Sequence, residues 1–267
     1  MKENKVKTVL FDMDGTLTEP RKSIKMNMVS ALSRLSKHAK VGIVTGSGFK
    51  YIEEQCSRLL WDNIGSQMNF ENFILMPCNG TKVYKMERSG LKLTYEADMK
   101  AKLGEEKYNS LIYKLIENQL RLKHTLYGKH MPLTGNFIDC RGSMINWCPI
   151  GRNANQEDRA LWVSLDLKHN IRNSILDNYF RSPDYSEIEI KLGGSTSFDL
   201  FPSGWDKTYA YNHLEVKDCY FIGDRCTGQG NDKEIYEKTK TCGLGAYEVK
   251  STKETIEKIN LLIGELK

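Results

Sequence analysis

The sequence predicts an α/β fold: a Rossmann-like, parallel-sheet core that is interrupted by an inserted α+β domain. Two observations lead to this prediction. Near both ends of the chain, short strands that are apolar throughout alternate with helical segments, whereas polar and apolar residues alternate in the middle of the chain. Strands apolar on both faces are typical of parallel sheets covered by helices, and alternation is typical of antiparallel strands with one solvated face. We therefore expect a discontinuous core domain, residues 1–84 and 204–267, and an inserted domain, residues 85–203.

The N-terminal segment has the order strand, helix, strand, helix, strand. Residues 8–11 are short and apolar, and they run directly into an acidic turn. Apolar residues recur at helical spacing in residues 26–35 and 49–60. Residues 41–44 and 73–76 are continuous apolar runs of strand length. This order predicts a βαβ series that forms one half of the parallel sheet.

The middle segment combines a charged helix with antiparallel strands. Residues 108–122 have the spacing of a charged helix. Residues 137–147 and 187–200 alternate between polar and apolar side chains, which predicts strands with one solvated face. This pattern defines the inserted domain.

The C-terminal segment returns to the first pattern. Residues 219–222 form a short apolar strand that leads into Gly223, and residues 243–249 are expected to be the last strand. Residues 251–266 predict a helix that opens with the capping box Ser251-x-x-Glu254. These elements complete the core sheet.

Composition excludes several classes of protein. The 267 residues carry a formal charge of +5 with 27% charged and 40% hydrophobic residues, so we expect a compact protein without a nucleic-acid partner. No apolar run approaches the roughly 18 residues that span a bilayer, and the first residues do not resemble a signal peptide. The seven cysteines include no C-x-x-C pair, which argues against a disulfide framework or a zinc site. We expect a cytoplasmic protein without a membrane partner.

The motif DMDGTLT, residues 12–18, directly follows the first apolar strand. Because strand side chains alternate, we expect Asp12 and Asp14 on the same side at the carboxyl end of the strand, where ligands bind in open α/β sheets. Two carboxylates this close repel each other unless a cation lies between them, and Mg²⁺ prefers carboxylate and phosphate oxygens. The motif predicts a Mg²⁺ site for a phosphorylated substrate, and the alternative is a surface Asx turn.

This motif resembles the first motif of the haloacid dehalogenase superfamily of phosphotransferases. Three further segments resemble the remaining motifs of that superfamily and occur in the expected order. They are Val44-Thr45-Gly46-Ser47, Lys207 in Gly204-Trp205-Asp206-Lys207, and Gly223-Asp224 with Asn231-Asp232. The resemblance implies the haloacid dehalogenase fold, with a catalytic core and an inserted cap.

The inserted domain permits a narrower assignment. Its motifs resemble those of the eukaryotic-type phosphomannomutases, and the resemblance extends over nearly the whole chain. They are Phe137-Ile138-Asp139-Cys140-Arg141, Pro149-Ile150-Gly151-Arg152, Glu157-Asp158-Arg159, and Ser197-Phe198-Asp199 followed by Gly204-Trp205-Asp206-Lys207. The resemblance implies that the inserted domain is a substrate-specificity cap.

Physical reasoning supports a phosphate-binding role for the cap arginines. Guanidinium groups match phosphate oxygens and stay charged at any working pH, so Arg141, Arg152 and Arg159 suit a phosphorylated ligand. Arg159 is expected in the first turns of a helix that is capped near Asn153. Ser197 and Asp199 lie on one face of a predicted strand, and a hydroxyl next to a carboxylate suits the hydroxyl groups of a sugar. The resemblance adds Arg21, just past the catalytic loop, to the substrate-binding residues.

The resemblance also implies a mechanism. Asp12 would be the nucleophile that forms an aspartyl phosphate, and Asp14 the general acid and base. Asp12, Asp224 and the backbone carbonyl of Asp14 would hold Mg²⁺, while Lys207 and Thr45 or Ser47 stabilise the transferring group. A hexose 1,6-bisphosphate would serve as intermediate and activator, retained by the cap. The substrates would be mannose 6-phosphate and mannose 1-phosphate, with glucose phosphates as further candidates, and the enzyme a homodimer through the cap.

Two other functions remain open from the sequence. A Mg²⁺-dependent sugar-phosphate or hexose-bisphosphate phosphatase would use the same first half-reaction and then water as the acceptor. A sugar-phosphate sensor or scaffold without catalysis is the third hypothesis, although Asp12, Asp14 and Asp224 are all present. One departure from the family pattern concerns a second, structural cation site, which the resemblance would place at Tyr236, Thr241 and position 238. Because position 238 is Lys238, we predict that this site is absent.

Overall fold

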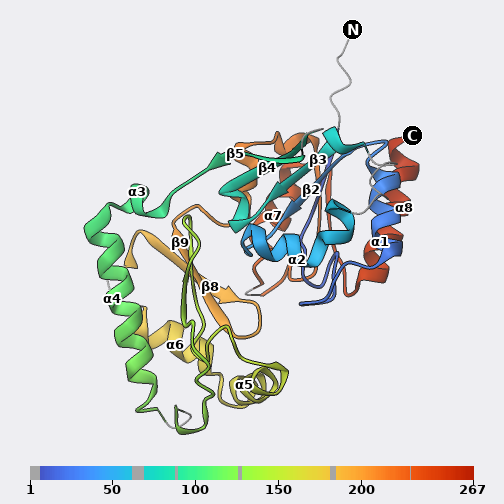
Figure 1. Cartoon of the computed structure of the whole chain (residues 1–267). Coiled ribbons are helices and arrows are strands. Elements are labelled where there is room, and N and C mark those ends of the chain that lie inside the picture. Colours follow the sequence, from blue (N-terminus) through green and yellow to red (C-terminus); the bar gives the residue numbers. More distant parts are fainter. Residues whose placement is uncertain (1–6, 62–68, 88–89, 126–127, 181–184, 229) are drawn as a thin grey trace. The chain divides into compact units, whose positions relative to one another are not determined.

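The computed structural model of the chain describes residues 7–61, 69–87, 90–125, 128–180, 185–228 and 230–267. It contains two compact units, and Figure 1 labels most of their helices and strands. The core unit consists of Met1–Glu96 and Trp205–Lys267, and the inserted unit is Ala97–Gly204. The chain therefore leaves the core once and returns to it once.

The insertion begins later than the sequence indicated. Strand β4 (Lys82–Glu87) pairs antiparallel with β3 (Phe73–Met76), and β5 (Gly90–Glu96) pairs antiparallel with β4. Both strands of this hairpin extend the core sheet, so the boundary predicted between residues 84 and 85 is wrong. Residues 85–87 and 90–96, which we assigned to the inserted domain, instead form the edge of the core sheet.

The core unit is built on a seven-stranded sheet of order β11-β10-β1-β2-β3-β4-β5. The first five strands in that order run parallel to one another. Their bounds are β1 Thr8–Phe11, β2 Lys40–Val44, β10 Cys219–Gly223 and β11 Gly245–Glu248, with β3 as given above. The predicted α/β class is confirmed.

Helices cover both faces of this sheet. Val9 and Phe11 pack in one apolar cluster with residues of α1 (Met26–Leu35), α2 (Phe49–Leu60) and α8 (Thr252–Leu266). Leu10 packs in a second cluster with residues of α7 (Lys233–Cys242) and of the 3₁₀ segment Lys207–Asn212. Successive residues of β1 therefore face opposite layers, which explains why the strand is apolar throughout.

The inserted unit has an antiparallel sheet of order β6-β7-β9-β8. Trp147 and Phe198 stack at 5.1 Å between ring centroids and are fully buried in this unit. The antiparallel pairing is as predicted, but β7 is buried throughout and β9 nearly so, and the predicted solvated face is therefore not found on these two strands. The strands are β6 Ile138–Cys140, β7 Ile145–Trp147, β8 Ile188–Gly193 and β9 Ser197–Pro202, and the helices are α3 Met99–Leu103, α4 Glu105–Leu122, α5 Gln156–His169 and α6 Ile171–Tyr179.

Helix α5 begins two residues later than predicted. The side chain of Asn155 accepts a hydrogen bond from the Asp158 backbone N–H at 2.9 Å, and the Asp158 carboxylate accepts from the Asn155 N–H at 3.4 Å. Asn153, the predicted cap, instead donates its side-chain amide to the carbonyl of Thr134 at 3.2 Å. A reciprocal capping box fixes the helix start at Asn155 and leaves Arg159 near the N-terminal end.

Helix α4, with 18 residues, is amphipathic. Leu111, Leu115 and Leu122 are buried within the inserted unit, whereas Tyr113 and Leu120 are exposed. Among the described residues, no helix combines the length and apolar character that crossing a membrane requires.

Candidate active site

Three neighbouring strands of the core sheet deliver polar side chains to one edge. Because β1 lies between β10 and β2, Asp12, Asp224 and Thr45 each follow the carboxyl end of one of three adjacent strands. The N–H of Asp12 still donates to the carbonyl of Ile222 at 2.9 Å, so the ladder between β1 and β10 continues up to this residue. This is the edge at which ligands bind in open α/β sheets.

A cluster of three carboxylates lies at this edge. One carboxylate oxygen of each of Asp12, Asp224 and Asp232 lies within 4.8 Å of the other two. The Lys207 ammonium donates hydrogen bonds to both Asp12 and Asp232. Lys207 is 1% exposed, and Asp232 is completely buried. A buried ammonium is tolerated only when it is paired, so these two bonds hold Lys207 in place.

The electrostatics of this cluster favour the binding of a cation. Burial and the charge of Asp232 raise the pKa of Asp12 well above its usual range, although Lys207 opposes this shift. Burial and the charge of Asp232 also raise the pKa of Asp224 to about 6. Burial alone would lower the pKa of Lys207, but the charges of Asp12 and Asp232 outweigh it and raise the pKa. Three carboxylates thus face a single ammonium, an imbalance that a divalent cation relieves.

One carboxylate oxygen of Asp224 is unpaired within the described part of the chain, at this edge of the sheet. Its Oδ1 is buried and has no hydrogen-bond partner among the described residues. Its other oxygen lies against Gly15, where a Cβ atom would come within 2.2 Å of Oδ2. Gly15 also has a φ of +89°, which favours glycine, so this position is constrained twice. The donor set and the unpaired oxygen fit a hard cation such as Mg²⁺.

Asp14 is held apart from this cluster, by residues that the sequence did not single out. Its Oδ1 accepts hydrogen bonds from the Tyr51 hydroxyl at 3.2 Å and from the Gln55 side-chain amide at 3.3 Å. The backbone N–H of Arg21 donates to the same oxygen at 3.3 Å, while the Arg21 side chain is exposed. Tyr51 and Gln55 are four residues apart on α2, a spacing that places two polar groups on one helix face. This four-residue spacing was the signal in the sequence from which Tyr51 and Gln55 could have been identified.

Thr45 and Ser47 lie together after β2. Thr45 is buried, and its hydroxyl accepts a hydrogen bond from the Ser47 backbone N–H at 3.1 Å. The N–H of Thr45 donates to the carbonyl of Met76 at 3.2 Å, which ties this loop to β3. The sequence-predicted hydroxyl groups are thus at the same sheet edge as Asp12.

The inserted unit contains a second polar cluster, in which five side chains form a closed ring. Arg141 Nε donates to Asp139 Oδ2 at 3.0 Å, and Arg152 Nε lies 3.3 Å from the same oxygen. Arg152 Nη1 donates to Asn146 Oδ1 at 2.9 Å, and Asn146 Nδ2 donates to Asp199 Oδ1 at 2.7 Å. Arg141 Nη1, at 3.8 Å from Asp199 Oδ1, closes the ring.

Ser197 and Arg159 are attached to this ring. The Ser197 hydroxyl accepts from Asn146 Nδ2 at 2.9 Å and donates to the carbonyl of Gly193 at 2.7 Å. Arg159 donates to three oxygens, among them the Arg152 carbonyl at 3.1 Å and the Thr196 hydroxyl at 3.0 Å. The structure therefore brings all five predicted cap residues into one neighbourhood.

Neither Asp139 nor Asn146 was among the site residues predicted from the sequence. Strand register explains why they matter: Asp139 pairs with Asn146 across β6 and β7, and Asn146 pairs with Asp199 across β7 and β9. Directly paired residues share a face of the sheet, so these three side chains form a row. Alternation indicated which residues share a face, but not which strands are neighbours.

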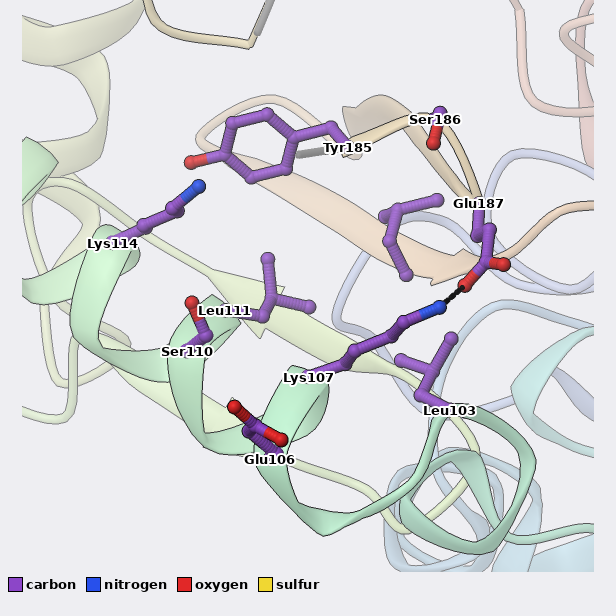
Figure 2. Close-up of a pocket in the computed structure, with 10 residues that line it drawn as sticks. Leu103, Glu106, Lys107, Ser110, Leu111, Lys114, Tyr185, Ser186 and Glu187 are labelled. Atoms are coloured by element: carbon purple, nitrogen blue, oxygen red, sulfur yellow. Dashed lines mark hydrogen bonds and ion pairs between the residues drawn. The ribbon is translucent and has the colours of Figure 1, made fainter. Parts of the chain in front are cut away.

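A cavity of about 420 Å³ lies elsewhere in the inserted unit, between α4 and the start of β8 (Figure 2). Its wall includes Tyr185 and the ion pair between Lys107 and Glu187 at 2.7 Å. None of the residues predicted to bind substrate lines this cavity. The chemistry predicted from the sequence is therefore concentrated in the two polar clusters.

Known proteins are similar to this chain over most of its length. The chain matches the family described as eukaryotic phosphomannomutase over residues 28–264. A phosphomannomutase from Dendrobium officinale is 36% identical over 255 residues, which cover 95% of this chain and 92% of that protein. Phosphomannomutase 2 from Dictyostelium discoideum is 36% identical over 267 residues, covering 97% of this chain and 98% of that protein.

Solved structures share the fold at low sequence identity. An IMP-nucleotidase from Plasmodium falciparum superposes with a TM-score of 0.61 at 17% identity, covering 98% of this chain and 69% of that chain. A trehalose-6-phosphate phosphatase related protein gives a TM-score of 0.52 at 13% identity, with 97% of both chains covered. These similarities support the haloacid dehalogenase fold predicted from the motifs.

Proposed function

Because the chain belongs to the eukaryotic phosphomannomutase family, we propose that it interconverts mannose 6-phosphate and mannose 1-phosphate. The observation that carries this proposal is the buried contact of Lys207 with Asp12, in a cluster completed by Asp224 and Asp232. This arrangement pairs a nucleophilic carboxylate with a fixed cation at a ligand-binding sheet edge. Phosphoryl transfer depends mainly on such positioning and charge stabilisation.

In the first half-reaction, a carboxylate oxygen of Asp12 attacks the phosphorus of one phosphoryl group of a hexose 1,6-bisphosphate, which leaves as a hexose monophosphate. An aspartyl phosphate forms, the bond from phosphorus to the sugar oxygen breaks, and the protonated form of Asp14 gives its proton to that oxygen. Tyr51 and Gln55 hold Asp14 through Oδ1, which supports its role as a separate acid and base. Lys207, Thr45 and Ser47 bind the transferring group.

The same residues suit Mg²⁺. Asp12 and Asp224 would hold the ion with their carboxylates, and Asp14 with its backbone carbonyl. When bound, Mg²⁺ neutralises the charge of the phosphoryl oxygens during transfer. The unpaired Oδ1 of Asp224 supports this assignment.

The inserted unit binds the part of the substrate that does not react. Arg141, Arg152 and Arg159 recognise the second phosphate, and Ser197 and Asp199 recognise sugar hydroxyl groups. Arg21, on the core unit, is a further proposed substrate-binding residue. Charge-assisted hydrogen bonds from guanidinium groups are well suited to phosphate. The ring of contacts around Asn146 supports this role because it holds these groups in one arrangement.

The acceptor distinguishes a mutase from a phosphatase. In the second half-reaction the hexose phosphate, rather than water, attacks the aspartyl phosphate and forms a hexose 1,6-bisphosphate. That bisphosphate reorients and returns one phosphoryl group to Asp12, and added bisphosphate serves as activator.

We also propose that the enzyme is a homodimer through the inserted unit, which the exposed side chains of Tyr113, Ile116 and Leu120 on α4 support.

A coupled assay tests this function. Mannose 1-phosphate and glucose 1-phosphate are supplied separately, with and without hexose 1,6-bisphosphate, and the formation of 6-phosphates and of inorganic phosphate is followed. The proposal predicts isomerisation that the bisphosphate activates. Release of inorganic phosphate without formation of a 6-phosphate would contradict it and identify a phosphatase.

A further inference from the structure

Asn146 occupies the centre of the polar ring in the inserted unit. It lies on β7 between β6 and β9, and its residue is 2% exposed. Its amide connects a cation to an anion: Oδ1 accepts from Arg152, and Nδ2 donates to Asp199 and Ser197. Three residues proposed to contact substrate are therefore bonded to one buried side chain.

We propose that Asn146 is a positioning residue that sets the orientation of Arg152 and Asp199, and through them the recognition of the hexose phosphate. This inference rests on the proposed function, because it takes these two residues as substrate contacts. Asn146 itself stays buried beneath them and acts through the groups that it holds.

The chemistry of the amide explains why asparagine suits this position. A guanidinium group can only donate hydrogen bonds, and a carboxylate can only accept them. The amide offers an acceptor to Arg152 and donors to Asp199 and Ser197, so all of these bonds are satisfied at once. An aspartate in its place would keep the acceptor, lose the donors and put a second negative charge next to Asp199. An apolar residue would lose both.

Charge balance gives the amide a second effect. The ring contains two guanidinium groups, Arg141 and Arg152, and two carboxylates, Asp139 and Asp199. Asn146 adds no charge, but it lies in the register position between Asp139 and Asp199. When its amide is removed, Arg152 and Asp199 are free to pair directly. Such pairing would use the hydrogen-bonding groups that recognise phosphate and sugar.

The test compares two isosteric or near-isosteric variants with a matched control. Asn146→Asp keeps the shape of the side chain, and Asn146→Leu keeps its branching and its number of heavy atoms. The control is Gln119→Leu, because Gln119 also bonds to the β7 region through Trp147 Nε1 at 2.8 Å and the Pro149 carbonyl at 2.9 Å. Gln119 contacts none of the proposed substrate residues in these bonds.

We measure KM and kcat for mannose 1-phosphate and glucose 1-phosphate, thermal stability, and calorimetric binding of each hexose phosphate. Both Asn146 variants are expected to raise KM for mannose 1-phosphate by about tenfold or more, the usual effect of losing a hydrogen bond to a charged group. The ratio of kcat/KM values for the two sugars is also expected to change. Gln119→Leu is expected to lower thermal stability with little effect on KM or on that ratio.

The inference is overturned if the Asn146 variants lower thermal stability as Gln119→Leu does and leave KM and the sugar ratio unchanged. Failure of the proposed function gives a different pattern, in which the wild-type protein isomerises neither sugar phosphate. Calorimetry still decides the inference in that case, because weaker binding in the Asn146 variants alone supports it and equal binding in all variants overturns it.

Discussion

Arg141 and Arg172 are two similarly buried arginines of the inserted unit, of which only Arg141 is proposed to bind substrate. Its side chain is 10% exposed, and it contacts Asp139 and Asp199 within the polar ring. Arg172, at 11% exposed, pairs with Asp166 at 2.6 Å and donates to the carbonyl of Gly194 at 3.0 Å. The two arginines are equally buried, so burial alone does not separate a substrate-binding residue from a structural one.

Replacing each arginine with alanine separates these roles. Arg141→Ala is expected to raise KM for mannose 1-phosphate by roughly tenfold or more, because it removes charge-assisted hydrogen bonds to phosphate. Arg172→Ala is expected to lower the melting temperature while KM stays close to the wild-type value. Steady-state kinetics and thermal denaturation measure both effects. Arg141 is structural if its variant loses as much stability as Arg172→Ala and keeps the wild-type KM.

Individual elements show how far the sequence could predict the structure. The strands at residues 8–11 and 73–76 and the helices at residues 26–35 and 49–60 agree with their predicted bounds, because apolar periodicity is strong in each. Most of the hairpin of β4 and β5 was assigned to the inserted domain, because the sequence does not reveal that two antiparallel strands extend the parallel core sheet. Periodicity therefore predicts elements better than it predicts their partners.

The same difference holds for the candidate site: most of its residues could be predicted from the sequence, but the contacts between them could not. The motif after the first strand predicted Asp12, and the family resemblance implied Asp224 and Lys207, but their contact depends on the strand order β10-β1-β2, which the sequence does not reveal. Asp232 was named as part of a motif, and the structure places it in the carboxylate cluster with its own bond to Lys207. Tyr51 and Asn146 were missed because their roles arise from contacts between elements that are distant in the sequence.

The sequence also led to a prediction about Lys238, namely that a second, structural cation site is absent. In the structure, the Lys238 ammonium lies 5.5 Å from the centroid of the Tyr211 ring, and the Lys240 ammonium lies 5.6 Å from that of Tyr236. An ammonium over an aromatic face is a favourable contact in its own right. The absence of the second cation site at Tyr236, Lys238 and Thr241 stays a prediction.

His213 directly follows the 3₁₀ segment Lys207–Asn212 and contacts two aromatic side chains, Tyr95 and Tyr209. The imidazole lies 4.6 Å from the Tyr95 ring and 6.0 Å from the Tyr209 ring, measured between centroids, and Nε2 is 3.0 Å from the Gly80 carbonyl oxygen. Burial lowers the pKa of His213 below its ordinary value, with a smaller contribution from Lys85, and this outweighs the effect of the bond to Gly80.

This shift predicts a pH dependence of stability. The folded state binds a proton at His213 less tightly than the unfolded state, so the contribution of His213 to stability falls as pH drops below about 6.5. The His213→Gln variant is therefore expected to lose less stability than wild type between pH 7.5 and pH 5.5. Urea denaturation at both pH values measures the difference, and an equal loss in both proteins would contradict the shift.

At the scale of the whole molecule, the chain divides its chemistry between two units. The core unit carries the groups proposed for phosphoryl transfer, and the inserted unit carries the guanidinium groups and sugar contacts proposed for recognition. A split of this kind predicts that variants in the two units fail differently. Changes in the core lower kcat, whereas changes in the polar ring raise KM.

In the proposed mechanism, Asp12 carries the phosphoryl group during the reaction. Mass spectrometry of the intact protein after brief incubation with hexose 1,6-bisphosphate and Mg²⁺ tests it most directly, with Asp12→Asn as the paired variant. The wild-type protein is expected to gain one phosphoryl group, which is located at Asp12 after proteolysis. The Asp12→Asn protein is expected to gain none and to lose isomerisation. A phosphorylated or mutase-active Asp12→Asn protein would contradict it.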